Sequence, residues 1–421
     1  MIAIQRLHNL DATVRVPGSK SLTQRALVIA ALAAGTSTIT HPLIADDTRC
    51  LIEALRLLGA HIDEEETSLR VTGTAGRIQN PGTRLLLDNN GTALRFLVSV
   101  AALGAGLFII DGSERLRERP VKPLLDALAV LGVESRTVEN GGCPPVVIQA
   151  RGRLEGGTVT FRNAESSQYI SSLLIAAPCA AGPIEIRVEG DTVSKPYIDM
   201  TMDVMKQFGV EAAAHEGVYR VNALPRYLPC DFTVEGDISS ASYFFLAAAL
   251  CRGKVRVENL NAGTIQGDLR VLEIFQRLGC RVSKGVGWIE VSGEAPAEGD
   301  FHFDMADIPD MVPTVAVLSA FRRGRTVISK VPHLRVKESD RIAALVTELN
   351  RIGVGAEERT DGLVIEGGSP HGAVIETYGD HRIAMSFAAA GLAMEGISIK
   401  DEECVRKSFP DFWKTLGELS E

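Results

Sequence analysis

The stretch VPGSKSLTQRALVIAALAAG, residues 16–35, combines an extended segment with an apolar run that has two cations near its start. Pro17 and Gly18 end an extended segment, and the apolar run that follows predicts a buried helix closed by Gly35. Lys20 and Arg25 lie at the start of this helix or within about two turns of it, where the helix dipole repels cations. The stretch therefore raises two questions, namely whether the helix recurs and what its cations are for.

The helix recurs six times, each time followed by a glycine and a strand-like segment. The copies read RALVIAALAAG, GTALRFLVSVAALGAG, YISSLLIAAPCAAG, SYFFLAAALCRG, VPTVAVLSAFRRG and RIAMSFAAAGLAMEG. Each is apolar on nearly every face, which predicts a central, buried helix. A second helix with one apolar face follows in each copy, and a glycine ends five of them, at Gly59, Gly132, Gly209, Gly279 and Gly353. The spacing of about 70–77 residues is too long for the common solenoid repeats and indicates small βαβ-type units.

The sixth copy stops before its last strands, whereas two strand-like segments, AIQRL and ATVRVPG, precede the first copy. We expect the N-terminal strands to complete the sixth copy, so that the chain crosses twice between two three-copy domains. The crossings are expected near residues 16–20 and 235–239. The predicted domains are residues 1–18 with 236–421, and residues 19–235. A connection by two strands suggests hinge closure around a ligand.

Cations gather where the helices begin. Serine, aspartate and asparagine at these places are ordinary N-caps, and prolines such as Pro196 are ordinary first-turn residues. Capping does not explain the cations, each of which costs a few tenths of a kcal/mol unless an anion is present. We therefore predict a site for phosphates or carboxylates. The cations are Lys20, Arg25, Arg119, Lys195, Lys337, Arg341, Arg382 and Lys407.

The same motifs fit three other interpretations less well or leave them open. The segment GSKS lacks the glycines of a P-loop, since Ser19 precedes the lysine. His381 in GDHR suggests a metal ligand or a base, but a lone histidine beside an aspartate is more often its hydrogen-bonded partner. Asp310 and Glu338 lie among cations, which fits either structural ion pairs or proton carriers beside bound anions.

The bulk properties are those of a globular protein with a full-sized core, 45% hydrophobic and 23% charged. A net charge of -9 argues against extensive nucleic-acid binding. The seven cysteines lack CxxC or zinc-site spacing, which predicts reduced thiols. No signal peptide is visible, and the apolar runs fall short of the roughly 20 residues of a membrane span. We expect a cytoplasmic protein.

The motifs together are similar, in order and spacing over essentially the whole chain, to those of the 5-enolpyruvylshikimate-3-phosphate synthase family. They are PGSKSLTQRAL, NNGTALR, RERPVKPLLDAL, ESSQYISSLLIAAP, VSKPYIDMTMDVMKQFG, DIPDMVPTVA, LRVKESDRI, YGDHRIAMSFA and RKSFPDFW. The resemblance implies an inverted two-domain α/β fold of six βαβαββ repeats, three per domain, with the active site in the cleft between the domains. It implies transfer of the enolpyruvyl group of phosphoenolpyruvate to the 5-hydroxyl of shikimate 3-phosphate, through a tetrahedral intermediate, in the shikimate pathway to chorismate and the aromatic amino acids. It also implies no cofactor, no metal, small-molecule substrates only, and a monomer.

The resemblance assigns roles residue by residue. Asp310 would accept the proton of the 5-hydroxyl and Glu338 would protonate the methylene carbon, with Lys20 as a third candidate for proton transfer. Shikimate 3-phosphate would meet Lys20, Ser21, Arg25, Ser166, Ser167, Gln168, Ser194, Asp310 and Lys337. Phosphoenolpyruvate would meet Lys20, Gly91, Arg119, Gln168, Arg341, Arg382 and Lys407. Two polyanions placed side by side require converging cations, which answers the question that Lys20 and Arg25 raised.

Three positions depart from the family's pattern. Many members have alanine where Asn90 stands and proline where Phe96 stands, so the response to the family inhibitor glyphosate is left open. His333 replaces an asparagine that contacts shikimate 3-phosphate in several members. Two alternative functions are considered. One is that of the sister enzyme, which uses UDP-N-acetylglucosamine, and the other is that of a non-catalytic anion-binding protein. The first has Lys-Asn where this chain has Lys20-Ser21, and the second would not need both carboxylates.

Overall fold

The computed structural model describes residues 1–139, 141–190, 192–224 and 226–420. The chain forms two compact units, unit 1 with Met1–Ser19 and Glu235–Glu421, and unit 2 with Lys20–Val234. Within the described residues, the strands form five sheets of four strands and one of three. None of the helices formed by these residues is both long enough and apolar enough to cross a bilayer.

Unit 2 holds three repeats that share one plan. Two parallel strands flank the first helix, and an antiparallel hairpin follows the second helix. The first repeat contains α1 (Lys20–Leu32), β3 (Thr36–Thr40), α2 (Asp46–Leu57), β4 (His61–Glu64) and β5 (Ser68–Thr72). The second contains β6 (Arg84–Leu86), α3 (Gly91–Ala101), β7 (Ala105–Asp111), α4 (Lys122–Val130), β8 (Glu134–Thr137) and β9 (Val146–Arg151). The third contains β10 (Gly157–Arg162), α5 (Ser167–Ala176), β11 (Ile184–Glu189), α6 (Pro196–Gln207), β12 (Ala213–His215) and β13 (Val218–Val221), and β14 (Asp231–Thr233) follows it.

Unit 1 repeats the plan. The fourth repeat contains α7 (Ile238–Leu250), β15 (Lys254–Glu258), α8 (Val271–Arg277), β16 (Cys280–Gly285) and β17 (Trp288–Gly293). The fifth contains β18 (Phe301–Asp304), α9 (Val312–Ala320), β19 (Gly324–Ser329), α10 (Arg341–Arg351), β20 (Gly355–Arg359) and β21 (Gly362–Gly367). The sixth contains β22 (Val374–Ile375), α11 (His381–Ala393), β23 (Ser398–Ile399) and α12 (Phe412–Gly417), and β1 (Ile2–Ala3) and β2 (Asp11–Arg15) come from the N-terminus.

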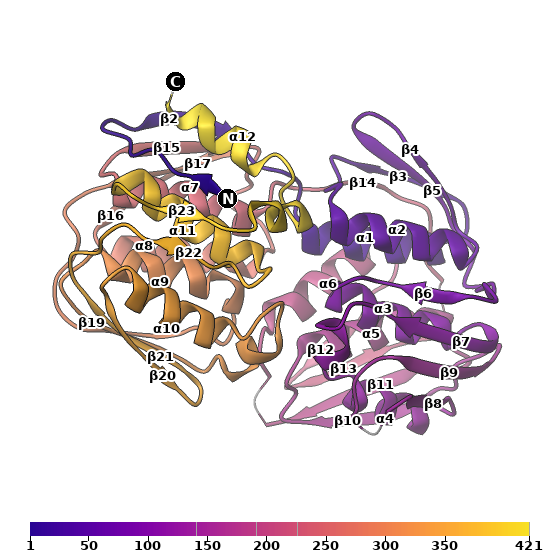
Figure 1. The fold of residues 1–421 in the computed structure, drawn as a ribbon. Helices are drawn as coiled ribbons and strands as arrows, with labels where there is room; N and C mark the ends of the chain where they lie inside the picture. Colours follow the sequence, from indigo (N-terminus) through magenta and orange to yellow (C-terminus); the bar gives the residue numbers. More distant parts are fainter. Residues whose placement is uncertain (140, 191, 225, 421) are drawn as a thin grey trace. The chain divides into compact units, whose positions relative to one another are not determined.

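The first helix of each repeat is the core element of its unit. In unit 1, α7, α9 and α11 pack against one another, and in unit 2 α3 packs against both α1 and α5 (Figure 1). Every residue of α9 and all but the last of α11 are buried. These helices are apolar all round because other elements cover every side, as their sequences predicted.

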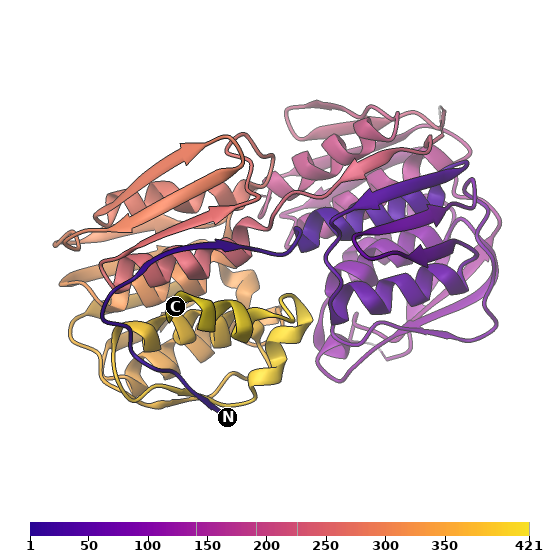
Figure 2. The same ribbon diagram turned by 90° about the horizontal axis from the view of Figure 1, so that it is seen from above.

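The N-terminal strands divide between two repeats, which corrects the expectation that both complete the sixth. β1 pairs with β23 of the sixth repeat, but β2 runs parallel to β15 of the fourth, from Asp11 opposite Lys254 to Arg15 opposite Glu258 (Figure 2). The fourth repeat lacks a strand of its own before α7, and β2 fills that edge. β14 does the same for the first repeat, pairing with β3.

Candidate active site

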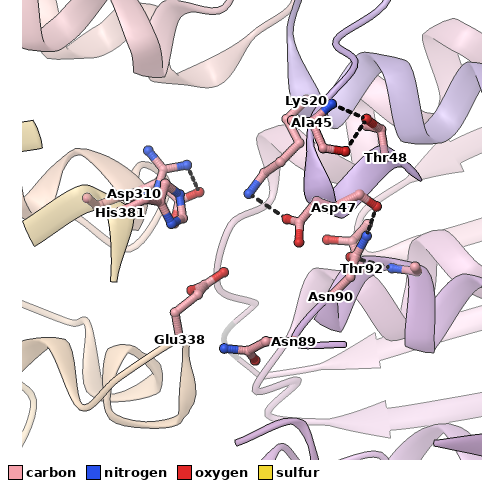
Figure 3. Close-up of polar contacts among 12 residues, drawn as sticks. Lys20, Ala45, Asp47, Thr48, Asn89, Asn90, Thr92, Asp310, Glu338 and His381 are labelled. Atoms are coloured by element: carbon pink, nitrogen blue, oxygen red, sulfur yellow. Dashed lines mark hydrogen bonds and ion pairs between the residues drawn. The ribbon is translucent and has the colours of Figure 1, made fainter. Parts of the chain in front are cut away.

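Lys20 is the first residue of α1, and a carboxylate balances its charge. Lys20 Nζ lies 3.1 Å from Asp47 Oδ2 in the first turn of α2, with the two side chains 14% and 6% exposed (Figure 3). The first turn of α1 has no acidic residue of its own. Asp47 was not selected from the sequence, because two aspartates at a helix start are typical first-turn residues.

The start of α3 is built around Gly91. A Cβ at this position would overlap Cζ and Nη2 of Arg119, and would lie 2.5 Å from Nη1 of Arg95. Arg119 is buried, and its Nη1 donates to the Asn89 carbonyl at 3.3 Å. Arg95 donates to the carbonyls of Gly91 at 3.0 Å and of Pro120 at 2.5 Å. The absence of a side chain at Gly91 thus lets one guanidinium reach this helix start while a second holds the two segments together.

The start of α5 joins the same group. Ser166 caps this helix by accepting from the Gln168 backbone N–H, and Gln168 Nε2 donates to Thr92 Oγ1 of α3 at 3.0 Å. Ser167 is buried beside them. The structure therefore brings Gln168 next to the segment that holds Gly91 and Arg119.

Arg25 is already held by the protein. Its guanidinium donates to Thr201 Oγ1 at 2.8 Å, to the Ser21 carbonyl at 3.1 Å and to the Tyr197 carbonyl at 3.0 Å. Burial lowers its pKa to about 10, so it remains charged at neutral pH. The ring of Phe96 lies 5.4 Å from this cation, which explains how the sequence accommodates a bulky residue there.

Two further helix-start residues lie at the beginning of α6. Ser194 is buried and has a φ of 59°, a left-handed conformation unusual for a serine. Lys195 follows it and pairs with Asp199 one turn later at 3.1 Å, with both side chains partly in solvent. An i,i+4 ion pair accounts for this cation without a ligand.

Unit 1 places two arginines on one carboxylate. Asp310 lies in a short 3₁₀ turn (Pro309–Met311), and it accepts from Arg341 Nη1 at 3.0 Å and from Arg382 Nη2 at 2.7 Å (Figure 3 shows Asp310). Burial alone raises the pKa of Asp310, but Arg382, Lys337 and Arg341 outweigh it and hold the pKa below its usual range. Asp310 is therefore ionised at neutral pH.

Arg341, the first residue of α10, bridges three carboxylates. Besides Asp310, it donates to Asp380 Oδ2 at 2.7 Å and to Glu338 Oε2 at 2.8 Å. Burial opposes its charge, yet Asp380, Glu338 and Asp310 raise the pKa of Arg341 above its ordinary value. Asp380 is also the N-cap of α11, accepting from the backbone N–H of Arg382. Asp380 was not predicted as a site residue, because the role of helix N-cap fully explains an aspartate at this position.

His333 lies in the 3₁₀ turn (Pro332–Val336) that precedes Lys337. It is buried, and among the described residues neither of its ring nitrogens has a hydrogen-bond partner. Burial, together with the positive charge of Lys337, lowers the pKa of His333 to about 3, so the imidazole is neutral at neutral pH.

Lys407 and His381 are also buried. Lys407 ends the 3₁₀ helix Glu402–Lys407, which packs on α11. His381 Nδ1 lies 3.8 Å from Asp380 Oδ1. In the part of the chain that the structure describes, no three His, Cys, Asp or Glu side chains are grouped as metal ligands.

The expected site residues thus fall into two sets, each within one unit. Unit 2 joins Lys20 to Asp47, and Gly91 to Arg119, while Arg25 is engaged by its own unit. Unit 1 joins Asp310, Glu338, Arg341 and Arg382 in one network of ion pairs. Both sets combine buried guanidinium or ammonium groups with helix starts, which is the chemistry of phosphate and carboxylate binding.

Comparisons with known proteins agree over the whole length. A family model described as EPSP synthase (3-phosphoshikimate 1-carboxyvinyltransferase) matches residues 4–416. The 3-phosphoshikimate 1-carboxyvinyltransferase of Methanothermobacter thermautotrophicus is 45% identical over 418 residues, 99% of this chain and 98% of that protein. The protein of the same name from Syntrophobacter fumaroxidans is 42% identical over 422 residues, 99% of each chain. The structure of EPSP synthase from Acinetobacter baumannii matches with a TM-score of 0.83 at 26% identity, over 99% of this chain and 97% of that one, which confirms the expected fold class.

Proposed function

The chain belongs to the EPSP synthase family, and on that basis we propose that it transfers the enolpyruvyl group of phosphoenolpyruvate to the 5-hydroxyl of shikimate 3-phosphate, a step of the shikimate pathway. The observation that carries this proposal is the network of Asp310, Glu338, Arg341 and Arg382, where two carboxylates lie on two buried guanidinium groups. A protein that only bound anions would gain nothing from carboxylates in such places, because they repel the ligand.

Phosphoenolpyruvate is proposed to bind the cations of both sets. Its phosphate and carboxylate match the paired donors of guanidinium groups. Gly91 and Gln168 lie beside Arg119 and at the start of α5, where backbone N–H groups favour an anion. The residues proposed for phosphoenolpyruvate are Lys20, Gly91, Arg119, Gln168, Arg341, Arg382 and Lys407.

Shikimate 3-phosphate is proposed to bind mainly through hydroxyl and amide groups. Serines at the starts of α1 and α5, and Ser194 before α6, offer hydroxyls to a phosphate and to a polyol ring. Arg25 contributes chiefly by its charge, because three of its N–H groups already bind the protein. The proposed residues are Lys20, Ser21, Arg25, Ser166, Ser167, Gln168, Ser194, Asp310 and Lys337.

The chemistry requires one proton donor and one acceptor in the first step. Glu338 gives a proton to the methylene carbon, C2 becomes electrophilic, and the 5-hydroxyl oxygen bonds to C2 while its proton passes to Asp310. In the second step the bond from C2 to the phosphate oxygen breaks, the phosphate takes up the proton that Asp310 received, and a proton of the new methyl group returns to Glu338 as the double bond to C2 forms again. Lys20 is the alternative proton donor to the phosphate. In these two steps every bond and proton is accounted for without transfer of electrons to a carrier.

The ion pairs explain how Asp310 becomes a base only when substrate is present. Arg341 and Arg382 keep its pKa low while they contact it. When these arginines bind the phosphate or carboxylate of phosphoenolpyruvate, the added negative charge offsets theirs and raises the pKa of Asp310 toward the range of an effective base.

Phosphate release from phosphoenolpyruvate tests the proposal, with shikimate 3-phosphate and UDP-N-acetylglucosamine compared as acceptors. We expect release only with shikimate 3-phosphate, and a fall of about 10²- to 10⁴-fold in kcat for Asp310→Ala and for Glu338→Ala. Asp126→Ala, an exposed partner of Lys122, is the matched control that keeps full activity. Release only with UDP-N-acetylglucosamine would favour the sister activity. No release despite tight binding of both substrates would leave an anion-binding protein.

A cytoplasmic location and a monomeric state are also proposed, on the family resemblance alone. Sedimentation of the purified protein near its monomer mass of 45.2 kDa would support the second.

A further inference from the structure

Asn90 joins two helix starts through a single side chain. It is 1% exposed and occupies the N-cap of α3, where Oδ1 accepts from the Ala93 backbone N–H at 2.9 Å. Its Nδ2 donates to the Asp47 carbonyl in the first turn of α2 at 2.6 Å (Figure 3). One partner is a donor and the other an acceptor, which fixes the orientation of the amide.

The Asp47 residue that receives this bond also holds Lys20. Its carboxylate Oδ2 lies 3.1 Å from Lys20 Nζ, while its carbonyl accepts from Asn90 and, at 3.2 Å, from Cys50 Sγ. The Asp47 backbone is therefore tied on one side to α3 and its side chain on the other side to α1. Displacement of this carbonyl would move the carboxylate with it, because both belong to one residue in a helical turn.

We propose that Asn90 is a positioning residue for Lys20, acting through Asp47, in addition to capping α3. Lys20 is the lysine assigned to both substrates, so the inference rests on the proposed function for its catalytic meaning. The positioning itself is a property of the protein without substrates. The same amide fixes the start of α3, so Gly91 and Lys20 keep a constant relation to each other.

Substitutions can separate the tether from the cap. Serine at position 90 still caps a helix well but is too short to accept from Ala93 and reach the Asp47 carbonyl at once. Aspartate keeps the capping oxygen and replaces the amide NH₂ with an oxygen that faces the Asp47 carbonyl, so it repels where Asn90 binds. Alanine loses both functions. Asn90→Ser and Asn90→Asp therefore remove the tether, and Asn90→Ala removes tether and cap.

The test is lysine labelling of the substrate-free protein by reductive methylation, with the rate at each site read by mass spectrometry. Lys20 is expected to react about fivefold faster in Asn90→Ser and Asn90→Asp than in the wild type, the change expected from loss of one hydrogen bond. Lys122, exposed in the same unit and paired with Asp126, is the internal reference and should keep its rate. Circular dichroism establishes that each variant is folded.

The labelling rates distinguish the bond that Asn90 donates to the Asp47 carbonyl from its role as the N-cap of α3. Faster labelling of Lys20 in Asn90→Ser, to a level similar to that in Asn90→Ala, supports positioning. A wild-type rate in Asn90→Ser, with a raised rate only in Asn90→Ala, would mean that Asn90 is a cap alone and would overturn the proposal. If Asn90→Ala does not fold, the comparison of Asn90→Ser and Asn90→Asp with the wild type decides in the same way.

A kinetic measurement then tests whether the position of Lys20 affects the proposed enolpyruvyl transfer. In Asn90→Ser, kcat/KM for phosphoenolpyruvate should fall about tenfold, with a smaller change in the KM for shikimate 3-phosphate, while thermal stability stays near that of the wild type. Unchanged kinetics in a variant whose Lys20 labels faster would overturn the catalytic meaning of the tether. Because labelling needs no substrate, it stands even if the wild type lacks transferase activity, in which case only the proposed function fails.

Discussion

Gly91 is the residue at which the smallest change should have the clearest effect. Alanine there would push its Cβ into the guanidinium groups of Arg119 and Arg95, the far ends of two flexible side chains, so both groups must shift while the backbone stays. We expect Gly91→Ala to fold normally and to raise the KM for phosphoenolpyruvate about tenfold, or about 1.4 kcal/mol of lost binding. Steady-state kinetics with each substrate varied in turn measures this.

Gly141→Ala is the matched control, since a Cβ at Gly141 comes within 4 Å of no atom of the described residues beyond its chain neighbours. An unchanged KM for phosphoenolpyruvate in Gly91→Ala would show that Arg119 does not act at this helix start.

His333 should make stability depend on pH. In the folded state burial lowers its pKa to about 3 from the 6.5 of an unperturbed histidine. Between these values the unfolded state binds a proton that the folded state does not, so stability is lost as the pH falls from 6.5 toward 3. His333→Asn should remove up to about 1.4 kcal/mol of this loss per pH unit. Urea unfolding of both proteins between pH 4 and 7 measures the difference, and parallel curves would contradict it.

Individual site residues could be predicted where a charged side chain occupies a position that its local structure does not favour. Arg341 and Arg382 were found because neither capping nor the helix dipole explains a cation at a helix start, Asp310 was singled out by the cations expected around it and by the family resemblance, and the structure joins all three. Asp47 and Asp380 were missed because their local explanation, a first-turn or N-cap carboxylate, is also true. The role of Arg25 at a ligand stays a proposal, whereas its bonds to Thr201 and Tyr197, 176 and 172 positions away, were not predictable because the sequence gives no contact over such a separation.

At the scale of elements, a buried hydrogen bond joins α10 to the segment before α11. Glu348 in α10 is fully buried and accepts from the Tyr378 hydroxyl at 2.7 Å and from the Glu376 backbone N–H at 3.2 Å. Tyr378 has a φ of 57°, a strained conformation that its surroundings must hold in place. It lies two residues before Asp380, so this bond helps to set the N-terminus of α11.

Tyr378→Phe should therefore destabilise the protein by about 1–3 kcal/mol, because it leaves a buried carboxylate oxygen without its donor. Glu348→Gln should cost at least as much, because an amide oxygen that accepts from Tyr378 turns the NH₂ group toward the Glu376 N–H and Arg351, two donors that the carboxylate now serves. Denaturant unfolding of both variants gives the two values. A Tyr378→Phe variant as stable as the wild type would contradict the role given to the hydroxyl.

The elements themselves were largely predictable, and their pairing was not. Apolar helices and alternating strands are determined by residues that are close together in the sequence. The six repeats could therefore be predicted from the sequence alone. The partner of β2 could not, because β15 is 243 positions away and any open sheet edge accepts a strand of that pattern. The repeat order left two edges open, and only the structure assigns β2 to one of them.

At the scale of the molecule, the two units differ in the parts of the chain that supply the strands of their sheets. The sheets of unit 2 contain only strands from Lys20–Val234, including β14, whereas unit 1 takes β1 and β2 from Met1–Ser19. A fragment of residues 20–234 should therefore unfold cooperatively on its own. A fragment of residues 235–421 should be much less stable until residues 1–19 are fused to its C-terminus by a Gly/Ser linker, which is feasible because the last 3₁₀ turn (Glu418–Ser420) contacts β2.

Thermal unfolding of the three fragments tests this division and the domain limits expected from the repeats. Equal stability of residues 235–421 with and without the fused segment would contradict the role given to β2.

We propose that Lys20 and Glu338 both take part in the enolpyruvyl transfer, and the path of the protons reports on their participation. The reaction would be run in D₂O with phosphoenolpyruvate and shikimate 3-phosphate, and the enolpyruvyl product analysed by NMR. We expect an enolpyruvyl ether on the 5-oxygen with deuterium in its methylene group, and little or no such product from Lys20→Ala or from Glu338→Ala. Product without deuterium, or full activity in either variant, would contradict it.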